Sequence, residues 1–336
     1  MKSWLSGSSS TSPSLTTTNT LPVDSPPSSS CFQSPYTIQS HQSPSLTPGI
    51  PLIRMDECLG FANSINSNTT QENVWFHTYW PAPFNDAQLL SMLRSFSATQ
   101  AGRIKIWIRD QHQETMLLRS QAWQLATAQR QQTLTFGRWS TLTGNNEEAY
   151  NMDYIGMLIL QQYGGVWFHP SIVFMRDWSA LVGGKREWMI QHDCQATHTG
   201  SHSLIDDDRT RRQQRHTLMH FFPNSTLLCH LIDTAANEGA AVKRIDFGKV
   251  YRNAYRDLMK RGVRPWSLLP WCLMNAADGC DTADSNAFQL FEIPKGGTAR
   301  LDGGIFALQY DLDKWTLNPG SLLDLLDQSH RTITGW

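Results

Sequence analysis

The stretch AYNMDYIGMLILQQYGGVWFHPSIVFMRDW, residues 149–178, predicts a helix, a glycine turn and a buried strand in quick succession. Apolar residues in its first half recur at three- and four-residue steps, which is typical of a helix packed on most of its surface. Gly164 and Gly165 end this helix, because glycine accepts the left-handed backbone that a C-terminal cap needs. An apolar strand follows and stops at Pro170. Such an α/β element brings a strand end to a crevice where open α/β sheets bind ligands, although the pattern fits an ordinary core equally well.

A second α/β unit precedes this stretch. Residues 74–80 are β-branched or aromatic and are followed by two prolines, which predicts a strand. Asn85 or Asp86 can cap the next helix, and residues 104–108 form a second apolar strand before Arg109 and Asp110. Strand, helix and strand at this spacing make one βαβ unit, so we expect an α/β fold.

The remaining elements are weaker in pattern. Expected helices cover residues 114–131, 227–236, 251–261 and 321–326, and expected strands cover residues 133–136, 187–191 and 305–308. Residues 1–50 are more than half Ser, Thr and Pro, so they cannot bury enough apolar surface to offset chain entropy. We therefore expect a disordered tail over residues 1–71 and one folded domain over residues 72–336.

Composition excludes several classes of protein. The net charge of −1 gives no polyanion-binding footprint, so nucleic acid is not expected as a partner. No run approaches the ~20 apolar residues of a membrane span, and the first residues lack the apolar core of a signal peptide. The six cysteines form no CxxC pair and leave the redox compartment open.

The central stretch resembles the signature of the DXD-motif glycosyltransferases, the sugar-binding-region family that includes α-1,6-mannosyltransferases. That signature runs S-D-x-x-R, a hydrophobic helix, and Y-G-G-x-Y-x-D-x-D. Asp153 matches its first Asp, and residues 163–165 match Y-G-G without a gap. Gly156 stands in place of the Arg, and His169 and Ser171 stand in place of the two DXD carboxylates. The apolar frame of the motif is present, and its charge is missing.

The resemblance implies a GT-A-like nucleotide-diphospho-sugar transferase fold, in which a mixed, mostly parallel sheet is flanked by helices. It implies a UDP- or GDP-sugar donor, a glycan or glycoconjugate acceptor, and residence in the Golgi. The cytoplasm is the alternative location, because the sequence has no anchor. The resemblance also places an H-Q-x-W-like strand at residues 77–80 and an acidic residue after the second strand. The residues expected to bind the nucleotide sugar are His77, Tyr79, Asp110, Asp153, Gly164 and Gly165.

The missing DXD carboxylates affect the expected binding of a metal ion. Glycosyl transfer must stabilise a departing diphosphate, which Mg²⁺ or Mn²⁺ usually does through carboxylate ligands. His169 could offer an imidazole to Mn²⁺ and Ser171 a weak neutral oxygen, so these are the candidate metal ligands. The loss of two carboxylates should lower cation affinity. An active enzyme would then use an altered or metal-independent site, in which Arg176, Lys185 or His169 offsets the phosphate charge.

Each candidate residue has a structural alternative. His77 can equally be a histidine whose hydrogen bonds are satisfied at a strand end, and Asp110 can equally be a helix or loop cap. The Asp153 carboxylate can contact a ribose or base, or it can accept a hydrogen bond from the backbone. Two functions follow: a hexosyltransferase, or a catalytically inactive family member that keeps a nucleotide-binding, glycan-binding or protein-interaction role. In the active case, His169 and Ser171 should stand at the rim of a cleft that also admits His77.

Overall fold

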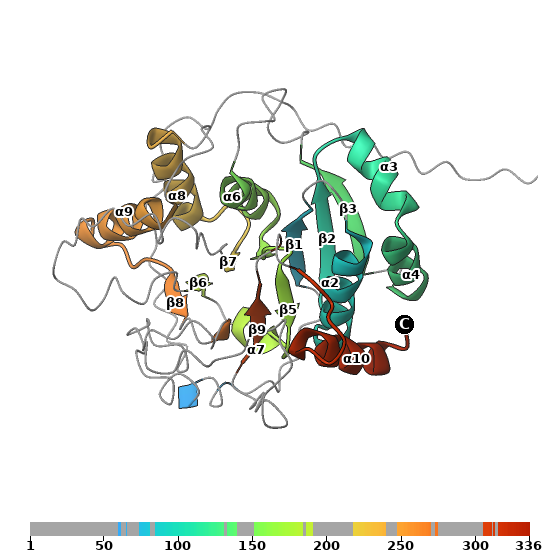
Figure 1. Cartoon of the computed structure of the whole chain (residues 1–336). Coiled ribbons are helices and arrows are strands. Elements are labelled where there is room, and N and C mark those ends of the chain that lie inside the picture. The colour runs from blue at the N-terminus through green and yellow to red at the C-terminus, as the bar shows by residue number, and fades with distance from the viewer. Residues whose placement is uncertain are drawn as a thin grey trace, which may run out of the picture.

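The computed structural model describes residues 60–61, 65, 74–80, 85–130, 133–139, 151–183, 186–190, 218–239, 247–269, 273–274, 305–310, 312 and 315–336 (Figure 1). Most of the expected tail, the acidic and basic run at residues 206–212, and Lys185 lie outside these ranges. The boundary between tail and domain therefore stays a prediction.

A seven-stranded sheet organises the chain, in the order β3-β2-β1-β4-β7-β6-β8. Its strands are β1 (Trp75–Tyr79), β2 (Arg103–Ile108), β3 (Leu134–Arg138), β4 (Gly165–Trp167), β6 (Trp188–Ile190), β7 (Met219–Phe221) and β8 (Ser267–Leu269). All neighbours pair in parallel except β7, which runs antiparallel to β4 and β6. The expected α/β class, with a mixed and mostly parallel sheet flanked by helices, is confirmed. A two-stranded antiparallel sheet joins β5 (Ile172–Phe174) to β9 (Ala307–Gln309).

Helices cover both faces of the large sheet. They are α2 (Asp86–Thr99), α3 (Gln111–Arg119), α4 (Gln121–Arg130), α6 (Met152–Tyr163), α7 (Ser179–Val182), α8 (Thr226–Asn237), α9 (Phe247–Lys260) and α10 (Leu322–Thr334). In Figure 1, α8 and α9 lie at the left beyond α6, and α3, α4 and α10 lie at the right. None of the helices in the described part of the chain combines the length and apolar character that a bilayer crossing demands.

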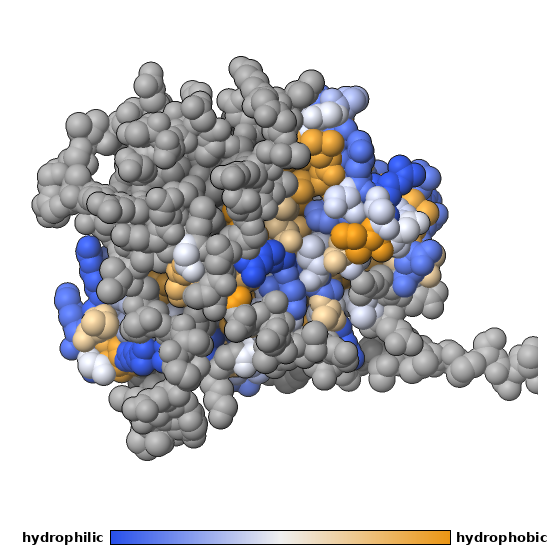
Figure 2. All heavy atoms as spheres, turned by 90° about the horizontal axis from the view of Figure 1, so that it is seen from below, coloured by the Kyte–Doolittle hydropathy of each residue, from blue (hydrophilic) through white to orange (hydrophobic). Residues whose placement is uncertain are grey.

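Strand β1 separates two apolar cores, because successive side chains of a strand point to opposite faces. Phe76 packs edge-on against Phe96 of α2, in the core shared with α4 and β5. His77 instead faces Tyr163 of α6, in the layer that continues through α8 to α9. Seen from below, apolar as well as hydrophilic residues reach the surface on the side of α3 and α4, where Leu118 and Leu125 are exposed (Figure 2).

The single helix expected over residues 114–131 is wrong, because Ser120 divides it into α3 and α4. The Ser120 backbone is extended, with ψ 129°. Its hydroxyl oxygen accepts a hydrogen bond from the backbone N–H of Trp123 at 3.2 Å, and so caps the second helix. Serine favours such local bonds over the helix interior, which explains the break.

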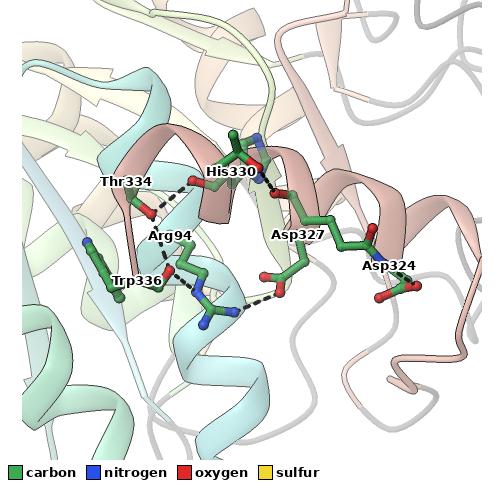
Figure 3. Close-up of polar contacts among 8 residues, drawn as sticks. Arg94, Asp324, Asp327, His330, Thr334 and Trp336 are labelled. Carbon is green, nitrogen blue, oxygen red and sulfur yellow. Dashed lines mark hydrogen bonds and ion pairs between the residues drawn. The ribbon is translucent and has the colours of Figure 1, made fainter.

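Helix α10 runs past the expected end at residue 326 and stops at Gly335, whose φ is +80°. It packs on α2 through a buried ion pair between Arg94 and Asp327, at 2.7 Å. The Arg94 guanidinium also donates to the backbone oxygen of Trp336 at 2.7 Å, as Figure 3 shows. One arginine thus fastens the last helix, and Trp336 beyond it, to α2.

Candidate active site

The parallel strands β1, β2, β3 and β4 end at one edge of the sheet, which we call the carboxyl edge. Tyr79 ends β1, Asp110 follows β2, and Trp139 follows β3. Helix α6 runs back over the sheet before β4 begins, so its first turn, with Asp153, lies at this edge too. Tyr79 and Trp139 belong to the same apolar cluster as the residues that flank Asp153.

Tyr79 is half-buried at the carboxyl edge and meets Trp139 edge-on, with ring centroids 5.9 Å apart. Burial raises the pKa of the Tyr79 phenol, while the nearby Trp139, Arg109 and Gln113 side chains lower it. The Trp139 indole nitrogen is buried beside Tyr79, and its interaction with the phenol oxygen is one of the causes that lower the Tyr79 pKa.

Asp110 is the N-terminal cap of α3. Its Oδ1 accepts the Gln113 backbone N–H at 2.9 Å, and its Oδ2 accepts the Arg109 Nε–H at 2.9 Å. These bonds hold the pKa of the Asp110 carboxyl below its ordinary value, since they favour the charged form. The contacts of Asp110 are therefore those of a helix cap, which is the alternative that the sequence raised. Arg109, which is half-exposed, is the cation that lowers the Tyr79 pKa.

Asp153 lies in the first turn of α6 and is buried. The side chain of Asn151 caps this helix by accepting the Asp153 backbone N–H at 2.8 Å. An acidic side chain in the first turn also suits the positive end of the helix dipole. The sequence position expected to hold an Arg one turn later is Gly156.

Gly156 leaves room for a tryptophan. A Cβ built on Gly156 would overlap the indole ring of Trp167 in β4. Gly156 and Trp167 therefore share one packing space, because the indole ring lies directly against the helix backbone at Gly156.

His77 uses both ring nitrogens within the fold. Its Nε2 donates to the carbonyl of Gly164 at 3.0 Å, and its Nδ1 accepts from the Trp107 indole N–H at 3.2 Å. His77 is 1% exposed. Burial, aided by the charge of Lys105, lowers its pKa to about 3, so the imidazole is neutral. These contacts match the satisfied-histidine alternative.

The twin glycines are held by two histidines. Gly164 and Gly165 have φ of +65° and +99°, which L side chains rarely adopt. A Cβ on Gly165 would clash with the carbonyl oxygen of Trp75 in β1. His220 of β7 donates from Nδ1 to the carbonyl of Gly165 at 2.8 Å, as His77 does to Gly164. This turn lies at the start of β4, away from the carboxyl edge.

His169 and Ser171 form a closed turn with each other. His169 Nδ1 accepts the backbone N–H of Ser171 at 3.2 Å and faces the Ser171 hydroxyl. The Ser171 carbonyl accepts the backbone N–H of Tyr310, which follows β9, at 3.1 Å. His169 is 2% exposed and Ser171 0% exposed, so both are buried and neither stands at an open rim. The expected rim position is wrong, because the turn folds both side chains inward against β9.

These two residues fit a divalent cation poorly. They bring no carboxylate, and Ser171 already occupies Nδ1 of the imidazole. Across the described ranges, no group of three or more His, Cys, Asp and Glu side chains could hold a metal ion.

The residues expected to bind the nucleotide sugar thus form two groups. Tyr79, Asp110 and Asp153 come together at the carboxyl edge, and His77 joins Gly164 and Gly165 at the start of β4. Sequence reasoning missed Arg109 and Trp139 as neighbours of Tyr79. Their position directly after expected strands was the available signal, because parallel strands end at a common edge.

Comparison with known proteins gives a distant likeness in structure. No family profile matches the sequence, and no curated protein sequence is similar to it. The fold is similar to the PaToxG glycosyltransferase, with a TM-score of 0.38 and 11% identity over 61% of this chain and 76% of that one. It is also similar to the glycosyltransferase GlyE of Streptococcus pneumoniae, with a TM-score of 0.48 and 11% identity over 78% of this chain and 62% of that one. Likeness at this level transfers no activity, ligand or residue role to this chain.

Proposed function

We propose that this chain is a GT-A-like glycosyltransferase that transfers a hexose from a UDP- or GDP-sugar to a glycan or glycoconjugate acceptor. The observation that carries the proposal is the group of Tyr79, Arg109 and Trp139 at the carboxyl edge, where sheets of this class bind ligands. Aromatic rings suit a base or a sugar, and a guanidinium suits a diphosphate.

The donor's diphosphate is held without a metal in this proposal. His169 and Ser171 do not fit Mg²⁺ or Mn²⁺, so the positive charge comes from the protein. Arg109 is the first candidate, because its side chain is 40% exposed at the carboxyl edge. Arg176, which the sequence also suggested for this role, lies after β5. Its guanidinium carbon stacks over the Phe306 ring, 4.4 Å from the ring centroid. The rings of Trp139 and Tyr79 would contact the donor, with Asp153 beside them.

His77, Gly164 and Gly165 act as positioning residues in this proposal. They fix the turn from α6 into β4, and thereby set the height of Asp153 and Trp167 against the sheet. Direct contact with the nucleotide sugar is assigned to Tyr79, Arg109, Trp139 and Asp153 instead.

Donor hydrolysis tests the activity. The full chain is incubated with UDP- and GDP-hexoses, and release of free sugar and nucleoside diphosphate is followed with EDTA or Mn²⁺ present. We expect turnover of one donor in EDTA, and loss of about 100-fold or more with Arg109→Ala, because a charged hydrogen bond to a diphosphate is removed. Arg119→Ala, at the exposed far end of α3, is the matched control and should keep wild-type turnover. Hydrolysis that needs Mn²⁺ would contradict the metal-free site.

The second candidate function is a non-catalytic role in nucleotide or glycan binding or in protein interaction. It is favoured by the missing DXD carboxylates and by the burial of both residues that replace them. Donor binding without hydrolysis or transfer to any acceptor would support it over the enzyme.

One cysteine supports the proposed location in the secretory pathway. Cys229 of α8 is disulfide-bonded. Because disulfides persist in oxidising compartments, this bond favours the secretory pathway, including the Golgi, over the cytoplasm. Peptide mapping of native protein without reducing agent tests it, and a fully reduced Cys229 would favour the cytoplasmic alternative.

A further inference from the structure

A row of basic side chains runs along the exposed side of α9 and the turn that follows. Between residues 249 and 264 the sequence has six basic residues and one acidic residue, Asp257, a local balance of +5 in a chain whose net charge is −1. The exposed basic residues are Lys249, Arg252, Arg256, Lys260, Arg261 and Arg264. We call this row the α9 basic face.

The row is a consequence of helical spacing. Arg252, Arg256 and Lys260 follow at four-residue steps, which places them along one side of the helix. The opposite side is buried against α8, through residues that include Val250 and Leu258. With a rise of about 1.5 Å per residue, residues 249–260 span about 17 Å. Helix α9 lies at the outer edge of the fold in Figure 1, and the six basic residues are exposed.

Three of the six basic residues have no acidic partner among the described residues. Lys249 meets Glu238 at 3.3 Å, and Arg261 meets Asp257 at 2.8 Å. Within the described ranges, Arg256, Lys260 and Arg264 have no ion pair. Uncompensated like charges on one surface repel one another, and an anionic partner would relieve that repulsion.

An apolar side chain lies within the row. Met259 stands beside Lys260 and is 58% exposed, the second-largest exposure among the large hydrophobic residues of the described chain. Tyr251 is buried and Tyr255 is half-buried, so the row offers little aromatic surface on which bases could stack. Basic side chains around a protruding apolar side chain suit a partner whose surface carries negative charge and whose interior is apolar.

We propose that the α9 basic face docks on a membrane surface rich in anionic phospholipid. The basic side chains contact the headgroups, and Met259 enters the interface between headgroups and acyl chains. Docking this way would bring the chain to glycoconjugates that are anchored in the bilayer, and it does not depend on the carboxyl-edge site.

Vesicle sedimentation tests the proposal. The full chain is mixed with vesicles of phosphatidylcholine alone, or of equal parts phosphatidylcholine and phosphatidylserine. We expect binding to the second set only, weakening as salt rises. Since each basic residue near such a surface contributes roughly fivefold in affinity at low salt, Arg256→Ala with Lys260→Ala should weaken binding about 25-fold.

The matched control is Arg119→Ala with Arg331→Ala, which removes two exposed charges from α3 and α10 and should bind as wild type. Equal thermal midpoints for the two double variants exclude unfolding as the cause. Wild-type binding by the α9 variant would overturn the proposal, as would binding to heparin or DNA without binding to the anionic vesicles.

Discussion

At the scale of single residues, Gly156 and Trp167 share one space. Gly156→Ala should destabilise the fold by about 1–3 kcal/mol, because its methyl group would overlap the Trp167 indole. Trp167→Tyr alone should also cost stability, because it leaves a void in the buried core. Together the two changes should cost less than the sum of the single losses. Urea denaturation of all four proteins measures this coupling, and additive losses would contradict a shared space.

His77 and His220 predict a loss of stability in acid. Burial lowers their pKa values to about 3 and about 4, whereas an unfolded histidine titrates near pH 6.5. The unfolded chain therefore binds more protons, and stability falls as pH drops from about 6.5, by up to about 1.4 kcal/mol per pH unit for each histidine.

Denaturation at pH 7 and pH 5 measures this slope. His220→Gln should flatten it, even though the variant starts less stable, because one buried titrating group is gone. His112→Gln, on the exposed surface of α3, is the matched control and should leave the slope as it was. A slope unaffected by His220→Gln would contradict the role of the buried imidazole.

At the scale of elements, α10 depends on the ion pair between Arg94 and Asp327 (Figure 3). Arg94→Met should destabilise the fold by about 3–5 kcal/mol, because it leaves a buried carboxylate without its cation. Arg94→Met with Asp327→Leu should recover part of the loss. Thermal denaturation checks both variants. Equal stability of Arg94→Met and wild type would mean that α10 is held by its apolar contacts alone.

Elements were foreseeable where the local pattern and the packing agree. The helix, twin glycines and strand at residues 152–167 lie where the sequence predicts, because glycines with positive φ and an apolar period leave few alternatives. The break at Ser120 was missed, since it depends on a side-chain cap rather than on periodicity. The early start of α9 at Phe247 was missed as well, because its first turn is anchored by tertiary packing.

At the scale of the whole molecule, the site could be predicted where it depends on which residues follow a strand, and could not be predicted where it depends on which strands pair. Residues after expected strands were visible as candidates, and Asp110 and Tyr79 do share the carboxyl edge. The inward turn of His169 and Ser171 could not be predicted from the local sequence. It depends on the pairing of β5 with β9, whose paired residues are more than 130 positions apart in the sequence. Aligning residues with a family motif predicts positions along the chain but not the side on which each side chain ends.

We propose above that the carboxyl edge binds a nucleotide sugar without a metal. Isothermal titration of the full chain with UDP- and GDP-hexoses in EDTA measures this binding, with Arg109→Ala and Arg119→Ala alongside. We expect one donor to bind the wild type and Arg119→Ala equally, and to bind Arg109→Ala at least about tenfold more weakly, which is the effect of losing about 1.4 kcal/mol. Absence of binding by every donor, or equal binding by Arg109→Ala, would contradict it.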